Sequence, residues 1–298
     1  MAHEPACVIR YADGDEEEWP IEPELLAAAR VSSRSAARPL QRPSYLFEGL
    51  RAQPFWPFET FPKVVALLEA CAPDLSEEVQ TLLEDELSDS SEESGTSLSR
   101  TQEAKRRKTT KADEKAESSS PWQQQGEGLH QGVWLKLEIW AKGGLVSSAK
   151  AVPRASAAIS AAMATGEAMA FAPGRAALSY MMCGVDVSPH CGPTNHRLRL
   201  HLPLLLPKKA SRSAGLTVAG EARDWELHKC LIFDDSFEHE VKLPTFTEPE
   251  VRDSLLDETR VVLLLDLWHP DAGFLKETAE SRALPRAKEL SDKRLQSR

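Results

Sequence analysis

The chain has few cysteines, an excess of acidic over basic residues, and no long apolar runs. Its 298 residues include 5 cysteines, an odd number without a C-x-x-C pair, so we expect reduced thiols rather than a disulfide framework. Lys and Arg number 36 against 46 Asp and Glu, and a net charge of −10 argues against a general nucleic-acid partner. No apolar run approaches the roughly 18 residues of a membrane helix. The first residues also lack the basic flank and apolar stretch of a secretion signal, so a cytoplasmic location is the default expectation.

Several common catalytic signatures are also absent. The sequence contains no phosphate-binding glycine loop, no H-E-x-x-H and no G-x-S-x-G. Its chemistry must therefore be sought in other residue patterns.

Composition changes divide the chain into segments. Residues 1–43 are acidic and then Ala/Arg/Ser-rich, which predicts a poorly ordered arm. Residues 84–120 have almost no apolar side chain and pass from an acidic block into a basic one, which predicts a disordered insertion. The basic run Lys105–Lys108 is either a nuclear-import signal or a solvated charge run in a linker. A charged tail occupies residues 276–298. One folded domain is expected at 44–275.

The folded part begins with helices and continues mainly as strands. An apolar stripe after Pro62 predicts one helix, and Ser76 followed by acidic residues predicts the start of a second. The segment GVWLKLEIWAKGG alternates apolar and polar residues as a half-buried strand does, and PRASAAISAAMATG is typical of an alanine-rich helix that ends before Gly166. Short apolar runs without intervening helices then favour an antiparallel sandwich or barrel.

Histidine and arginine concentrate in the second half of the chain. If 195–202 is a strand, alternation places Arg197, Arg199 and His201 on one face. Two guanidiniums beside an imidazole predict an anion site, because the Arg fork matches a carboxylate. The alternative is an exposed face with its charges in water. Six of the 8 histidines lie between 190 and 269: His190, His196, His201, His228, His239 and His269.

Two histidines on separate strands would make a metal centre. The segment CLIFDDSFEHEV predicts a strand, a turn at DDS and a return through His239. Imidazoles that meet from separate strands of one barrel suit iron, zinc or copper. A zinc site from Cys183, His190, Cys191 and His196 is an alternative, although its spacings lack the paired short loops of structural zinc.

Three blocks resemble a known family. PHCGPTNHRLRLHLPLLLP, FDDSFEHEV and RVVLLLDLWHP are similar to the signature blocks of the aspartyl/asparaginyl β-hydroxylases, and the similarity extends from about Ser44 onward. The resemblance implies an iron(II)- and 2-oxoglutarate-dependent dioxygenase domain over 44–275. It also implies a mainly β, double-stranded β-helix (jelly-roll, cupin-like) core with flanking N-terminal helices.

The resemblance assigns roles to individual residues. It implies that His190 and His239 are the iron ligands, and that Gly192 stands where many such oxygenases have a ligating carboxylate. Asp235 would then hold a water in the vacant position by a hydrogen bond, without binding the iron itself. Arg260 corresponds to the arginine that clamps the distal carboxylate of 2-oxoglutarate. The other implied contacts are Arg199, His201, Ser179 and Met181 for the co-substrate, and Arg197 for the substrate's own carboxylate.

The implied reaction is hydroxylation of an aspartyl, asparaginyl or similar residue of a protein. Dioxygen is consumed, succinate and CO2 are co-products, and ascorbate is the expected reductant. The expected partner is a protein or peptide with an acidic or amide side chain. Two alternatives stay open: a hydroxylase of a lipid or small molecule in the same family, and a catalytically idle β-barrel that serves as an interaction module.

The sequence departs from the family pattern in three places. Between the second iron histidine and the clamp arginine lies an extra loop, 242–258, either a surface loop that shapes substrate access or an artefact of the gene model. Residues 84–120 form a second insertion, and His228 stands where a glycine is usual in the family. None of these departures removes an implied ligand.

Overall fold

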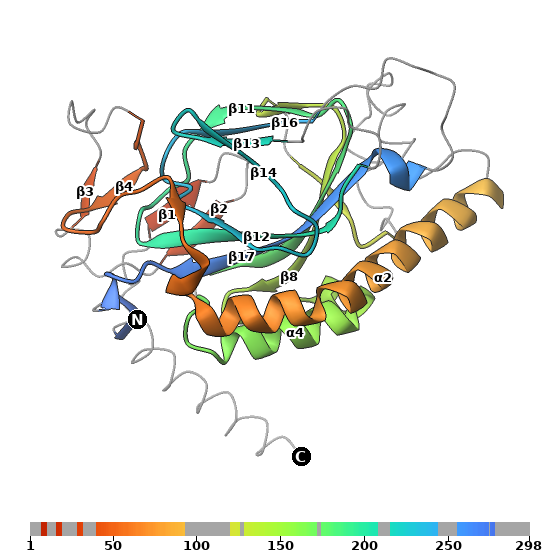
Figure 1. Ribbon diagram of the computed structural model, residues 1–298, viewed down its shortest axis with the longest axis horizontal. Helices are drawn as coiled ribbons and strands as arrows, with labels where there is room; N and C mark the ends of the chain where they lie inside the picture. The colour runs from red at the N-terminus through yellow and green to blue at the C-terminus, as the bar shows by residue number, and fades with distance from the viewer. Residues whose placement is uncertain are drawn as a thin grey trace, which may run out of the picture.

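Two antiparallel sheets form the framework of the computed structural model (Figure 1). The structure describes residues 7–10, 16–19, 29–31, 40–92, 120–125, 128–171, 174–207, 215–243, 255–273 and 275–277. The larger sheet has the order β5 (Phe55–Trp56), β15 (Leu231–Phe233), β12 (Arg197–Leu205), β17 (Thr259–Trp268), β10 (Ala176–Met182), β8 (Trp134–Ala141), β6 (Gln123–Gln124), with β9 (Gly144–Leu145) beside β8. The smaller sheet has the order β14 (Glu221–Asp224), β13 (Gly215–Val218), β16 (His239–Lys242), β11 (Asp186–His190), β7 (His130–Gln131).

The chain alternates between these sheets from β10 onward. β10, β12, β15 and β17 belong to the larger sheet, while β11, the β13–β14 hairpin and β16 between them belong to the smaller one. Neighbouring strands such as β12 and β17 are therefore far apart in sequence. This winding is that of a double-stranded β-helix, so the predicted jelly-roll core is confirmed.

The helices cover the outer face of the larger sheet. α2 (Pro62–Glu92) contacts α4 (Pro153–Met163) and β12, and both helices lie below the sheet in Figure 1. Every second strand residue packs toward them, and Leu198, Leu200 and Leu202 are fully buried in this outer core. Short 3-10 helices occur at Phe58–Thr60, Ser147–Ala151 and Leu255–Glu258.

The alternate residues of the same strands point between the sheets. On β12 these are Arg197, Arg199 and His201, as the alternation predicted. An inner apolar core fills part of this space and includes Met181, Val187, Phe233 and Val241. The polar face of the GVWLKLEIW strand therefore turns toward the interior of the sandwich rather than toward water.

The N-terminal helices differ from the prediction. One helix runs from Pro62 to Glu92 with Pro73 inside it, so Ser76 does not begin a second helix. The Ser76 hydroxyl donates instead to the Leu204 carbonyl on β12 at 2.8 Å. Residues 84–92, expected to start the disordered insertion, are helical because extending an anchored helix costs little after nucleation.

The arm also contains ordered elements. β1 (Cys7–Arg10) pairs with β2 (Glu16–Trp19), and β3 (Ala29–Val31) pairs with β4 (Tyr45–Phe47). Strands β1, β2 and β3 and residues 40–43 are the part of the predicted arm, residues 1–43, that the structure describes.

Several sequence predictions fall on other parts of the chain. Residues 93–119, with the basic run at 105–108, lie outside the described residues, as do 244–254 of the extra loop and the tail from 278. The two ends of the extra loop are ordered, in β16 and in the 3-10 helix at Leu255–Glu258. In the described part, no helix is both long and apolar enough to cross a membrane.

Candidate active site

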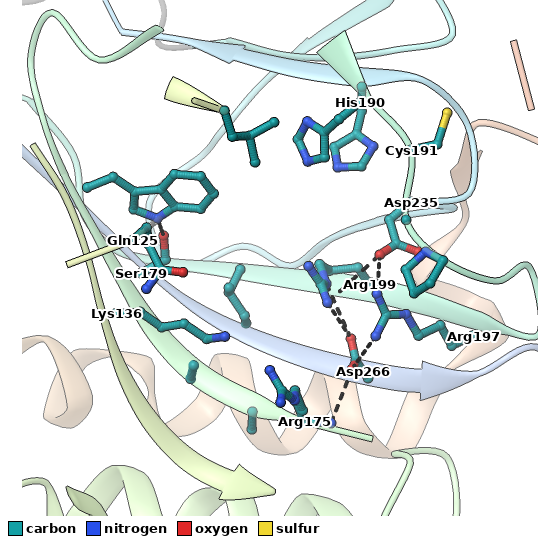
Figure 2. A pocket seen from close by; sticks show the side chains of 18 residues that line it. Gln125, Lys136, Arg175, Ser179, His190, Cys191, Arg197, Arg199, Asp235 and Asp266 are labelled. Carbon is teal, nitrogen blue, oxygen red and sulfur yellow. Dashed lines mark hydrogen bonds and ion pairs between the residues drawn. The ribbon is translucent and has the colours of Figure 1, made fainter. Parts of the chain in front are cut away.

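A cavity lies between the two sheets. Six of the predicted site residues line it: Ser179, His190, Arg197, Arg199, Asp235 and His239. Figure 2 shows the side chains of Ser179, His190, Arg197, Arg199 and Asp235 around this cavity. These residues, with His239, come from β10, β11, β12, β16 and the turn before β16. The other three, Arg260, His201 and Met181, are buried at 1%, 6% and 3% exposure and do not line this cavity.

His190 and His239 meet across the smaller sheet. They are register partners on β11 and β16, next to a bulge, and their ring centroids are 4.1 Å apart. Each Nδ1 lies 2.9 Å from the carbonyl two residues earlier, of Ser188 and Phe237 respectively. A carbonyl only accepts, so each Nδ1 carries the proton and each Nε2 carries the lone pair. Paired imidazoles oriented in this way are suited to bind a metal ion.

His239 is neutral in this environment. Burial, together with neighbouring His190, lowers the pKa of His239 to about 3. A metal ligand must offer an unprotonated nitrogen, so this shift keeps the ring ready for a metal at physiological pH.

Asp235 fills the space beside Gly192. A Cβ on Gly192 would lie 2.5 Å from the Asp235 carboxyl carbon and 2.5 and 2.7 Å from its two oxygens. Only a glycine permits this approach. The Oδ1 atom of Asp235 is buried without a hydrogen-bond partner among the described residues, and such an acceptor would suit a water molecule in the cavity.

Two arginines and two carboxylates form a buried network on the cavity wall (Figure 2). Arg197 donates to Asp235 at 2.7 Å and to Asp266 at 3.1 Å, and its side chain is 1% exposed. Arg199 donates twice to Asp266, at 3.1 and 3.2 Å, and is 23% exposed. Burial alone would raise the pKa of Asp235, but Arg197 and Arg199 hold it below its usual value. Asp235 is therefore an ionised carboxylate.

Asp266 was missed by the sequence analysis. Its signal is a lone acid in the apolar strand RVVLLLDLW, directly opposite Arg199 in the β12–β17 register. Lys136 and Arg175 also line the cavity and were missed. Lys136 is the register partner of Ser179, so it enters the cavity next to a predicted co-substrate contact.

Arg260 is a buried cation of a different kind. No carboxylate in the described part of the chain pairs with it, and its guanidinium lies 3.5 Å from Ser179 Oγ. Burial lowers the pKa of Arg260 to about 9, so it still carries its charge at neutral pH. A buried guanidinium without an acid is a site that an anionic ligand would complete.

The alternative zinc site of Cys183, His190, Cys191 and His196 is not found among the described residues. Across the residues that the structure describes, no three His, Cys, Asp or Glu side chains lie where they could hold one metal ion. Cys183, Cys191 and His196 therefore do not join His190 in a metal site. The cavity offers two imidazoles, with a carboxylate behind them.

The sequence model of one family, described as Aspartyl/Asparaginyl beta-hydroxylase, matches residues 69–270. The chain is 42% identical over 98 residues to the aspartyl/asparaginyl beta-hydroxylase of Mus musculus, covering 33% of this chain and 11% of that protein. It is 39% identical over 106 residues to aspartate beta-hydroxylase domain-containing protein 2 of Rattus norvegicus, covering 36% and 27%. The matched segments thus span only a small part of these relatives.

Two solved structures align with parts of the chain at low similarity. A non-heme monooxygenase, the ThoJ–nickel complex, aligns with 68% of this chain and 70% of its own at 14% identity and a TM-score of 0.32. A prolyl-4-hydroxylase of Pseudomonas putida aligns with 48% and 74% at 15% identity and a TM-score of 0.29. The match over residues 69–270, together with the jelly-roll winding, identifies the family. The chain belongs to the aspartyl/asparaginyl β-hydroxylase family.

Proposed function

We propose that the chain is an iron(II)- and 2-oxoglutarate-dependent dioxygenase that hydroxylates an aspartyl, asparaginyl or similar residue of a protein. The carrying observation is the pair His190 and His239, with both Nδ1 protons bonded to backbone and a ring separation of 4.1 Å. These imidazoles would hold iron(II). The bound iron would supply dioxygen activation coupled to the oxidation of 2-oxoglutarate to succinate and CO2.

The co-substrate would bind where the larger sheet is basic. In this proposal Arg260 clamps the distal carboxylate of 2-oxoglutarate, and Ser179, whose hydroxyl accepts a hydrogen bond from Trp134 at 3.0 Å, lies beside it. In the same proposal the buried side chains of His201 and Met181 would also contact 2-oxoglutarate. A carboxylate there would pair the charge that Arg260 carries unpaired.

Asp235 would hold a water molecule beside the metal without binding the metal itself. Its unpaired Oδ1 is placed to accept a hydrogen bond from a water, and Gly192 leaves room for it. Arg197 was predicted to hold the substrate's carboxylate, and this role stays a prediction. We favour a positioning role, because its guanidinium already pairs with Asp235 and Asp266 inside the protein.

A protein substrate with an acidic or amide side chain is supported by the family and by the cavity wall. Lys136 and Arg175 also line the cavity, and Arg175 lies 3.7 Å from the Glu138 carboxylate. Ammonium and guanidinium groups donate hydrogen bonds, so these side chains would suit a carboxylate or amide oxygen of the bound substrate. The preserved histidine pair and Arg260 disfavour the idle barrel, while a lipid or small-molecule substrate is an alternative that substrate screening would distinguish.

Anaerobic calorimetry of the metal-free protein tests this assignment. Wild type should bind iron(II) and then 2-oxoglutarate, and His190→Ala or His239→Ala should lose iron binding. His228→Ala is the matched control, because His228 lies outside the cavity and bonds Ser76 on α2. Arg260→Ala should weaken 2-oxoglutarate binding and retain iron. Equal iron affinity in all three histidine variants, or equal loss of both ligands in Arg260→Ala, would refute the assignment.

A further inference from the structure

Trp225 packs against the unpaired arginine. It follows β14, is 7% exposed, and belongs to the inner apolar core. The guanidinium carbon of Arg260 lies 4.2 Å from the centroid of its ring. A cation over an indole face is attracted by the ring quadrupole, and this contact adds no negative charge.

The N–H group of the same indole contacts His201. Trp225 Nε1 donates to His201 Nδ1 at 3.3 Å, and the two rings are nearly parallel, at 25° with centroids 6.0 Å apart. An indole N–H only donates, so His201 Nδ1 must be the unprotonated nitrogen. A neutral His201 therefore carries its proton on Nε2, where it is a donor.

We propose that Trp225 is the positioning residue of the co-substrate site: its ring orients the Arg260 guanidinium, and its N–H fixes His201 as an Nε2 donor. This inference rests on the proposed function. It assigns a role to a residue that is not among those lining the cavity.

The contrast with Arg197 shows why an indole is used here. Arg197 is held by Asp235 and Asp266, and these acids neutralise it. An acid in the place of Trp225 would hold Arg260 equally well but would repel a dicarboxylate. The indole face orients the cation while its positive charge remains available for an anion.

Two substitutions separate the two contacts. Trp225→Phe keeps an aromatic face over Arg260 and removes the N–H to His201. Trp225→Leu removes both contacts and keeps apolar bulk. Trp122→Phe is the control, because Trp122 is also 7% exposed but packs against Tyr180, with ring centroids 5.9 Å apart, in the outer core.

The test measures 2-oxoglutarate and iron(II) binding by anaerobic calorimetry, with the KM for 2-oxoglutarate alongside. The Kd for 2-oxoglutarate should rise about two- to tenfold in Trp225→Phe, the value of one lost hydrogen bond. It should rise by a further factor of about three to ten in Trp225→Leu. Iron affinity and kcat at saturating 2-oxoglutarate should stay within about twofold of wild type in both variants, since a positioning role for the co-substrate affects its binding alone.

A spectroscopic readout isolates the effect on His201. In 15N-labelled protein, His201 should show the Nε2–H tautomer in wild type and in Trp122→Phe, and lose it in Trp225→Phe. Unchanged 2-oxoglutarate affinity with an unchanged tautomer in Trp225→Phe would overturn the inference and leave the proposed function standing. Wild-type protein that binds iron(II) but no 2-oxoglutarate would overturn both.

Discussion

At the scale of single residues, Gly192 decides how close the Asp235 carboxylate can come to the backbone that follows β11. The carboxyl carbon of Asp235 lies 2.5 Å from an ideal Cβ on Gly192. The acid reaches this place from the turn before β16. The sequence showed that residue 192 has no side chain, but only the fold shows that Asp235 fills the space beside it.

Gly192→Ala should therefore damage the site more than its small size suggests. The added methyl must push Asp235 aside and disturb its pairing with Arg197. We expect iron(II) affinity to fall at least about tenfold and the free energy of unfolding to fall by about 1–3 kcal/mol, as overpacking costs. Gly144→Ala is the control, because nothing lies within 4 Å of its Cβ position. An iron affinity equal to wild type in Gly192→Ala would contradict the packing described.

Asp235→Asn tests the charge of the same acid. Removing one partner of a buried ion pair leaves Arg197 undercompensated, and such losses cost about 3–5 kcal/mol of stability. Asp271→Asn is the matched control, because its pair with Arg51 is exposed and such pairs contribute about 0–1 kcal/mol. Chemical denaturation measures both variants. Equal losses in the two would mean that the buried network does not depend on the charge of Asp235.

At the scale of elements, α2 is joined to the sheet by Ser76. Its hydroxyl contacts the Leu204 carbonyl and, at 2.8 Å, the His228 ring, which links the helix to β12 and to the loop before β15. His228 has a φ of 62°, in the left-handed region that favours glycine. The helix partner thus accounts for a histidine where the family usually has glycine.

Ser76→Ala should lower the free energy of unfolding by about 1–2 kcal/mol, since the Leu204 carbonyl and His228 lose a partner. Thr81→Ala on the same helix is the control, because the Thr81 hydroxyl bonds only the exposed Glu77 carbonyl. Urea denaturation should separate the two variants. If Ser76→Ala unfolds at the same urea concentration as Thr81→Ala, the contact with β12 does not stabilise the fold.

Two buried histidines, His196 and His269, contact the segment that contains Phe47 and Arg51. Their burial should make the free energy of unfolding depend on pH. Burial lowers the pKa of His196 to about 3, and burial also lowers the pKa of His269, which bonds the Arg51 carbonyl. Both rings are neutral when folded, while the unfolded chain takes up protons below its ordinary histidine pKa of about 6.5. Stability is therefore full above that pH and declines as the pH falls toward 3.

His196 should lower the free energy of unfolding by about 1.4 kcal/mol per pH unit between 6.5 and its folded pKa of about 3. Unfolding free energies measured between pH 7 and 4.5 should show a shallower decline in His196→Asn than in wild type, after allowing for a lower stability at pH 7. The same slope in both proteins would show that His196 is not neutral in the fold.

Local patterns predicted the elements well where the sequence period decides them. Alternation placed Arg197, Arg199 and His201 on one face, and the structure confirms it. The spacing of apolar residues could not predict that Asp266 and Trp225 belong to the site, because the residues they contact lie on strands far away in sequence. The sequence pattern also failed to predict that α2 continues through Pro73. The helix continues because residues beyond the proline, such as Val79 and Leu83, are buried in the outer core.

At the scale of the whole molecule, the net charge is −10, yet several Lys and Arg side chains line the cavity between the sheets. Four cations line the cavity, Lys136, Arg175, Arg197 and Arg199. Asp235 and Asp266 pair with Arg197 and Arg199, and Glu138 pairs with Arg175. The jelly roll brings these cations together by winding β8, β10, β12 and β17 into one sheet beside the histidine pair of the other. A chain with a negative net charge thus gathers cationic hydrogen-bond donors around its cavity.

The most direct test of the central claim is succinate formation from 2-oxoglutarate by the purified protein with iron(II), ascorbate and dioxygen. Wild type should form succinate, even without a protein substrate, through uncoupled turnover. His239→Ala should form none, and Arg260→Ala should recover activity only at much higher 2-oxoglutarate. His228→Ala should match wild type. Absence of succinate from iron-loaded wild type with every acidic or amide peptide offered, or equal turnover in His239→Ala, would contradict the account.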